Sequence, residues 1–167
     1  RAFALDTLFP SISRPDHQIT HSVPVIIGCF WLVRSTAIEN VGMLDEGFFI
    51  YAEDFDWCKR FRSAKWDIVY YPKTSAIHYG GASSSNEKMR FNLEMRRAMM
   101  RYYRKHKGML AQSTIFIIAL IHEVIRIAGQ LARLLVSKND REVPLYKIQR
   151  SWSSIAWLLK FEWINFK

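Results

Sequence analysis

The chain has 167 residues, half of them hydrophobic and 14% aromatic, which is enough for one domain with a buried core and excludes an intrinsically disordered chain. Two cysteines without a Cys-x-x-Cys pair exclude a disulfide framework and favour a reducing, cytoplasmic setting. The sequence begins at Arg1 without a charged-then-apolar leader, so we expect no secretory signal in it and expect it to be a piece of a longer protein.

The net charge of +9 is divided unevenly along the chain. Residues 1–83 carry eight lysines and arginines against nine acids, whereas residues 84–167 carry sixteen against six. Basic charge of this density is typical of proteins that bind nucleic acid or an anionic membrane surface. We therefore expect two parts, a near-neutral one over residues 1–85 and a basic one over residues 86–167.

The first part is predicted to contain strands and short helices. Residues 1–22 have no sustained period and predict a loop. The apolar run from Val23 to Val33, interrupted by Pro24 and Gly28, predicts a buried strand with a glycine where the backbone comes close to another group. A second strand is predicted over Trp66 to Tyr71.

Two helices are predicted between these strands. Thr36 and Glu39 have the spacing of a capping box, and Gly42 closes that short segment. The next helix is predicted from Glu53 to about Ala64, because its acids come first and its cations last, as the helix dipole favours.

The second part is predicted to be helical. Residues 86–107 indicate a basic helix that ends at Gly108, and residues 109–137 a more apolar one whose polar residues share one face. A polar loop over residues 137–144 leads to a last segment rich in tryptophan and phenylalanine.

Three interpretations of the apolar helix stay open. A membrane span needs about 20 consecutive apolar residues, and the longest uninterrupted run here is Ile115 to Ile121. We therefore favour a helix that lies in the membrane interface over a true span, and the third interpretation is a helical cap packed on the first part. Nucleic acid is not expected as a partner, because the basic part has long aliphatic faces and no recognition motif.

The densest chemical signal is a group of five acids within twelve residues, set between aromatic side chains: Asp45, Glu46, Glu53, Asp54 and Asp56. A carboxylate among aromatic groups tends to have a raised proton affinity and can act as a general base. The same acids are also typical of a first helical turn. Asp45-Glu46 is predicted only to shape a turn, and Asp56 to form an ordinary i,i+4 ion pair with Arg60.

Four blocks of the first part agree in order and spacing with a known family: GCFWLVR (28–34), VGMLDEGFFIY (41–51), EDFDWCKR (53–60) and HYGG (78–81). Together they resemble the family-2 inverting nucleotide-sugar glycosyltransferases of the GT-A fold, the rhamnosyltransferase-like group most closely. The resemblance implies an α/β chain that forms the C-terminal, acceptor-side half of that fold, followed by a helical extension. No Asp-x-Asp metal motif precedes the acidic segment, so we expect the donor-binding half to be missing from this chain.

The resemblance also implies roles for single residues. Asp54 matches the general base and Glu53 its companion, while Gly28 matches a glycine beside the acceptor site. Trp31, Tyr51 and Gly80 are expected to contact acceptor or donor. His78 matches a histidine that binds the divalent metal, Mg or Mn, or the donor diphosphate, although a single histidine after a strand is often only a hydrogen-bonding residue.

The family pattern is not followed everywhere. Lys65 stands where these proteins often have glycine, Cys29 where alanine is common, and Trp57 where leucine usually follows the acid. None of the three is the expected base.

The implied function is transfer of rhamnose or a related hexose from a nucleotide-diphosphate sugar to a glycan or lipid-linked acceptor. It would take place on the cytoplasmic face of an anionic cell membrane, to which the protein attaches peripherally. The alternative is a non-catalytic, membrane-attached interaction module that retains the fold.

Overall fold

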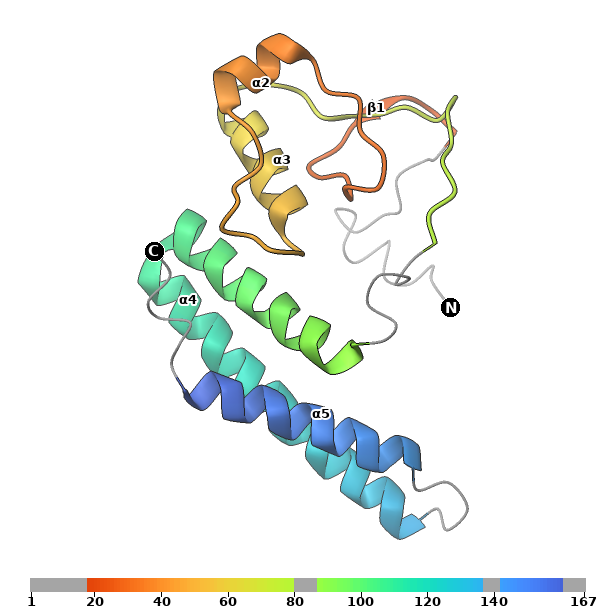
Figure 1. The fold of residues 1–167 in the computed structure, drawn as a ribbon, viewed down its shortest axis with the longest axis vertical. Coiled ribbons are helices and arrows are strands. Elements are labelled where there is room, and N and C mark those ends of the chain that lie inside the picture. The colour runs from red at the N-terminus through yellow and green to blue at the C-terminus, as the bar shows by residue number, and fades with distance from the viewer. Residues whose placement is uncertain (1–17, 80–86, 137–141, 161–167) are drawn as a thin grey trace, which may run out of the picture.

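The computed structural model describes residues 18–79, 87–136 and 142–160. Its elements are, in chain order, β1 (His21–Ser22), α2 (Ser35–Val41), α3 (Glu53–Ser63), β2 (Val69–Tyr70), α4 (Lys88–Val136) and α5 (Glu142–Leu159). Figure 1 shows the first four elements grouped together, with α3 over the first part of α4 and α5 beside the second part.

The sheet is far smaller than predicted. β1 and β2 pair antiparallel, with His21 opposite Tyr70. The apolar run over residues 23–33 is irregular and turns at Gly28, so the prediction of a strand there is wrong. Pro24 has no N–H for a ladder and a glycine weakens a strand interior, which explains the difference. The described residues are mostly helical, and the GT-A α/β half-fold stays a prediction.

Both short helices are found where they were predicted. The N–H of Gly42, with φ at 83°, donates to Ile38 O at 2.7 Å and closes α2. The capping box is wrong, because α2 begins at Ser35 and its N-cap residue Arg34 makes no side-chain capping bond. Helix α3 begins at Glu53 as predicted.

At the end of α3, Lys65 occupies a backbone conformation that glycine would favour. Lys65 has a φ of 64°, in the left-handed region that glycine occupies most easily. The N–H of Trp66 donates to Phe61 O at 2.9 Å, which reverses the chain after the helix. Lysine therefore stands at a position whose backbone favours the glycine common in the family.

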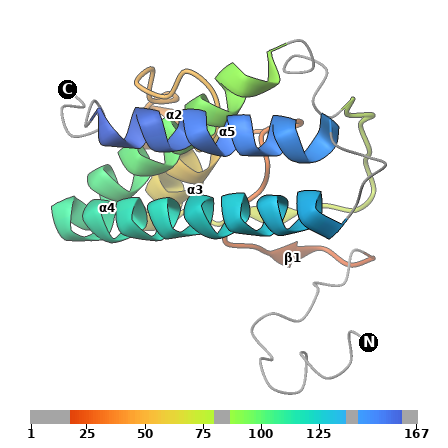
Figure 2. The ribbon, with the colours of Figure 1, turned by 90° about the horizontal axis from the view of Figure 1, so that it is seen from below.

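Helix α4 consists of two arms that meet at Gly108. This residue has φ 82° and ψ −176°, which is not helical, so the predicted end of the basic helix is confirmed. We call residues 88–107 the N-terminal arm and residues 109–136 the C-terminal arm. Figures 1 and 2 both show α5 running beside the C-terminal arm. Helix α5 begins at Glu142, inside the predicted loop, because Pro144 is tolerated in a first helical turn.

Three small apolar clusters hold these elements together. Trp57 and Phe61 of α3 pack on Ala37 of α2, and Trp157 and Leu158 of α5 pack on Met100 of the N-terminal arm. The third cluster joins the chain before α3 to α4 and contains Phe48, Ala52 and Ala98. The acidic segment is therefore fixed from both sides, by the α2–α3 cluster and by α4.

The C-terminal arm has exposed apolar side chains and two buried polar ones, while its Ile115, Phe116 and Ala119 pack on the Met100–Trp157–Leu158 cluster. Within this arm the buried residues are Gln112 and Glu123, and Glu123 forms an ion pair with Arg96 of the N-terminal arm. Ile118 and Ile125 are 55% and 65% exposed. By length and composition α4 is long and apolar enough to cross a membrane, and only 6% of its most apolar window is buried. The predicted polar face exists, but part of it points inward.

Because α4 bends at Gly108, alanine should destabilise the protein at Gly108 and stabilise it at Gly129. Gly108→Ala should destabilise the protein by about 1–3 kcal/mol, because a Cβ is unfavourable at this φ and ψ. Nothing lies within 4 Å of a Cβ built there, so the cost is in the backbone alone. Gly129→Ala, also without neighbours within 4 Å, should stabilise by about 0.5–1 kcal/mol as an ordinary helical position. Urea unfolding gives the free energy of unfolding of both variants. Equal changes in the two would contradict a non-helical backbone at Gly108.

Candidate functional site

The carboxylate of Asp54 lies against the turn at Gly28. Asp54 is the second residue of α3 and is 8% exposed. Its Oδ1 accepts a hydrogen bond from the N–H of Phe55 at 2.8 Å, and its Oδ2 accepts one from the N–H of Gly28 at 3.4 Å. A Cβ at Gly28 would lie 3.3 Å from the ring of Trp31 and 3.7 Å from Asp54 Cβ. Three predicted site residues are thus brought together across 26 positions of sequence.

The backbone before the acid pair is held in an unusual conformation. Tyr51 and Ala52 have φ values of 67° and 61°, both left-handed without being glycine. Each such residue costs about 1–3 kcal/mol and persists only when its surroundings hold it. Ala52 is buried against Ala98, and the ring of Tyr51 meets that of Phe91 edge-on, with centroids 6.3 Å apart. Contacts with α4 therefore fix the direction in which α3 begins.

Glu53 holds its proton more tightly than an ordinary glutamate. Burial raises the pKa of its carboxyl above the usual 4.5, and the negative charge of Asp54 raises it further against an opposing backbone hydrogen bond. Its Oε2 is buried and has no hydrogen-bond partner among the described residues. Within the acidic segment the pKa is therefore raised at Glu53 and lowered at Asp45 and Asp56, so the expectation of raised proton affinity does not hold for the segment as a whole.

The other predicted site residues have different surroundings. Trp31 is half-buried with its ring 5.3 Å from that of Trp57, so it forms a wall between the Gly28 turn and the α2–α3 cluster. His78 is exposed, and Gly80 lies outside the described residues. Nowhere in residues 18–79, 87–136 and 142–160 do three metal-ligating side chains gather. The described residues therefore offer His78 as one candidate ligand and no complete metal site.

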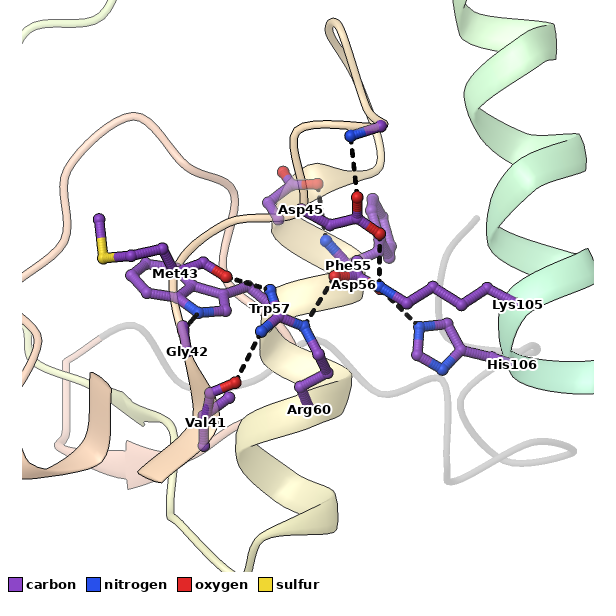
Figure 3. A network of polar contacts seen from close by, with 12 residues as sticks. Val41, Gly42, Met43, Asp45, Phe55, Asp56, Trp57, Arg60, Lys105 and His106 are labelled. Atoms are coloured by element: carbon purple, nitrogen blue, oxygen red, sulfur yellow. Dashed lines mark hydrogen bonds and ion pairs between the residues drawn. The ribbon is translucent and has the colours of Figure 1, made fainter. Parts of the chain in front are cut away.

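The buried carboxylate of Asp56 joins α3 to α4 (Figure 3). Asp56 is fully buried, and its Oδ2 accepts from Arg60 Nε at 2.9 Å, which confirms the predicted i,i+4 pair. Its Oδ1 is 2.7 Å from Lys105 Nζ and 2.8 Å from His106 Nε2. Burial raises the pKa of Asp56, but the bonds from these three side chains outweigh it and bring the pKa below 3.8.

Arg60 and Trp57 fasten α3 to the loop after α2. Arg60 Nη1 donates to Val41 O at 2.9 Å and Nη2 to Met43 O at 2.6 Å. Trp57 Nε1 donates to Gly42 O at 2.8 Å. Helix α3 is thus tied to the chain after α2 on one side and, through Asp56, to α4 on another.

Asp45 shapes a turn, as predicted, and also reaches α4. Its Oδ1 accepts from the N–H of Gly47 at 2.8 Å, and its Oδ2 is 2.6 Å from Lys105 Nζ. Burial raises the pKa of Asp45, but the bonds from Lys105 and Gly47 lower it below its usual value. Sequence reasoning missed Lys105 and His106; the available signal was the four-residue spacing of Arg97, Arg101 and Lys105 along one helical face.

The Asp56 network generates a prediction for stability and its pH dependence. Asp56→Asn should destabilise the fold by about 3 kcal/mol, because cations gathered around a buried anion lose their partner. Since the folded-state pKa of Asp56 is below its unfolded value, the difference should be full above about pH 5 and shrink below about pH 4. The free energy of unfolding of both proteins is measured with urea above about pH 5 and below about pH 4. Asp67→Asn removes an exposed carboxylate and should change little; equal losses would contradict the special role of Asp56.

Comparison with known proteins identifies short matches to rhamnosyltransferases. The chain is 42% identical over 52 residues to "Rhamnosyltransferase WbbL" of Escherichia coli, which is 31% of this chain and 20% of that protein. It is 37% identical over 60 residues to the "N-acetylglucosaminyl-diphospho-decaprenol L-rhamnosyltransferase" of Mycobacterium tuberculosis, 36% of this chain and 20% of that protein. The chain thus spans about a fifth of the length of the curated relatives that it matches. No family model and no solved structure matches it.

Proposed function

We propose that this chain belongs to a glycosyltransferase that uses a nucleotide-sugar donor, and that Asp54 is its general base. The observation that carries the proposal is the carboxylate of Asp54, held by Gly28 and Phe55 beside a second carboxyl, Glu53. The short matches to rhamnosyltransferases support sugar transfer as the reaction.

The proposed reaction is one in-line displacement. The acceptor hydroxyl gives its proton to Asp54 and attacks the anomeric carbon of the donor, whose bond to the nucleotide diphosphate breaks with inversion. The N–H of Phe55 fixes Oδ1, so that Oδ2, on the side of the Gly28 turn, faces the acceptor. Burial raises the pKa of Glu53, the carboxyl that precedes Asp54 on α3.

The proposed substrates follow from the relatives and from the family resemblance. The name of the mycobacterial relatives joins a sugar, a diphosphate and decaprenol in one molecule, so we propose a lipid-linked or polysaccharide acceptor. The proposed donor is a nucleotide-diphosphate rhamnose or related hexose. A divalent cation, Mg or Mn, would neutralise the leaving diphosphate. His78 alone does not make a site for it, and no step above is routed through a metal.

We also propose that the protein attaches to the cytoplasmic face of the membrane through the C-terminal arm. An exposed apolar face with a polar side turned inward is unfavourable in water and favourable against lipid. Residues 84–167 carry sixteen lysines and arginines against six acids, which favours an anionic lipid surface. On one side the C-terminal arm contacts the N-terminal arm, where Glu123 pairs with Arg96. The C-terminal arm would therefore lie in the membrane interface with its other side toward lipid.

The catalytic proposal predicts the effect of removing one charge. Asp54→Asn should lower sugar transfer by a factor of about 10²–10⁴, the usual contribution of a general base. We would measure nucleotide release by the full-length protein that contains this chain, with Mg²⁺ or Mn²⁺, a panel of nucleotide sugars and a membrane lipid extract.

The matched control for this experiment is Glu46→Gln. It removes an exposed carboxylate from the same acidic segment and should leave turnover unchanged. Turnover that is indifferent to Asp54→Asn would remove the assignment of the base. Absence of turnover in the wild-type protein with every donor would favour the non-catalytic interaction module.

The membrane proposal predicts the loss of vesicle binding in a double variant. Ile118→Glu with Ile125→Glu places two charges on the exposed apolar face and should reduce binding to anionic vesicles at least about tenfold, since a buried isoleucine contributes about 1.5–3 kcal/mol. Both side chains are more than half exposed, so the fold should persist. Vesicle flotation measures the binding.

Ser35→Glu with Thr36→Glu is the control for charge. It adds the same two negative charges at exposed positions of α2. Equal loss of binding in both double variants would show that net charge alone drives attachment. Retention of the wild-type protein on vesicles after alkaline carbonate extraction would contradict an interfacial position and favour a true span.

A further inference from the structure

A hollow rich in arginine lies between the loop before α3 and the N-terminal arm. Its volume is about 350 Å³. Three arginines and one glutamate supply its charged groups, and two phenylalanines border them. The lining residues are Gly47, Phe48, Phe49, Ile50, Arg90, Glu94, Arg97, Ala98 and Arg101. Each arginine also has one acid partner, Glu87 for Arg90, Glu94 for Arg97 and Asp45 for Arg101.

The arginines are held in place by rings and by single acids. The guanidinium of Arg90 lies 5.5 Å from the centroid of the Phe49 ring, and that of Arg101 5.4 Å from the Phe48 ring. Arg97 Nη1 is 2.9 Å from Glu94 Oε1. A guanidinium stacked on a ring keeps its N–H groups at the edge, where they can bind phosphate oxygens in pairs.

Gly47 makes the close approach of one arginine possible. A Cβ at this position would overlap the guanidinium of Arg101 as it is placed here, so a larger residue would push that side chain away from the loop. Arg101 also lies 3.6 Å from Asp45, the residue that shapes the same loop. The loop and the arm therefore form one preorganised wall of the hollow.

The hollow adjoins the proposed catalytic segment. Ile50 lines it, and Glu53 and Asp54 begin α3 three residues later. The N-terminal arm, which supplies all three arginines, continues through Gly108 into the arm with the exposed isoleucines.

We propose that this hollow binds the diphosphate of a lipid-linked acceptor. The inference rests on the proposed function, which it deepens by giving the acceptor's head group a site. The diphosphate chemistry is shared with a nucleotide-sugar donor. We assign the hollow to the acceptor because its arginines belong to the helix that carries the apolar surface.

Direct binding by the full chain tests the assignment. The double variant Arg90→Gln with Arg97→Gln removes two arginines whose side chains are 57% and 44% exposed, which leaves the core intact. Affinity for farnesyl diphosphate, measured by calorimetry at fixed salt, should fall at least about tenfold, because hydrogen bonds to charged groups contribute strongly. The affinity of the same variant for UDP and dTDP should stay within about twofold of the wild-type affinity, because the proposal assigns these arginines to the acceptor and not to the donor.

The control is Lys88→Gln with Lys107→Gln, which removes two exposed cations from the same arm outside the hollow. It should leave the binding of farnesyl diphosphate unchanged, and equal loss in both double variants would overturn the proposal in favour of general attraction. Loss of UDP or dTDP binding with farnesyl diphosphate unaffected would also overturn it and make the hollow a donor subsite. Absence of farnesyl diphosphate binding in the wild-type protein would overturn it outright.

The two proposals fail in different ways. Binding needs no turnover, so it is measured equally well in Asp54→Asn, which should bind farnesyl diphosphate as the wild-type protein does. If Asp54→Asn turns over normally while the arginine variant loses binding, the base assignment fails and the acceptor hollow stands. A third variant, Arg90→Lys with Arg97→Lys, keeps the charge and should still lose affinity, because lysine cannot form the paired hydrogen bonds.

Discussion

The arrangement of this chain depends on the buried carboxylate of Asp56. A buried anion costs several kcal/mol unless its charge and its lone pairs are matched. Here Arg60 from the same helix and Lys105 and His106 from α4 supply that match. The interaction links segments about 50 residues apart and fixes α3 against the N-terminal arm. The position of every residue at the start of α3, including the proposed base, follows from it.

Two aspartates on one helix are thereby given different roles. Asp54 and Asp56 are two residues apart, so their side chains leave α3 in nearly opposite directions. Asp56 turns to α4 and is surrounded by cations, whereas Asp54 turns to the Gly28 backbone. The cations beside Asp56 stabilise its charge, and that charge serves the structure. Among the bonds described for Asp54 none comes from a cation, which suits a carboxylate that must take up a proton.

Local signals in the sequence predicted the helices well where they came from the helix dipole and from glycine breaks, which act within a few residues, whereas the predicted capping box failed. The start of α3 at Glu53 and the break at Gly108 are examples. The predicted strand over residues 23–33 failed, because hydropathy alone could not weigh Pro24 and the Gly28 turn against an apolar run. The partners of Asp56 on α4 were beyond prediction, since helical periodicity places residues on a face without saying which distant segment that face meets.

In the C-terminal arm, periodicity predicted a polar face but not what that face contacts. The spacing of its polar residues revealed one polar face, and a soluble protein normally turns such a face to water. In this structure Glu123 of that face pairs with Arg96, and nearby Asn92 Nδ2 donates to Ser154 Oγ at 2.9 Å, so polar groups hold the helices together from within. The isoleucines are then left outside. Polar contacts thus act beside the apolar cluster of Met100, Trp157 and Leu158, and the exposed isoleucines are the feature on which the proposed lipid contact rests.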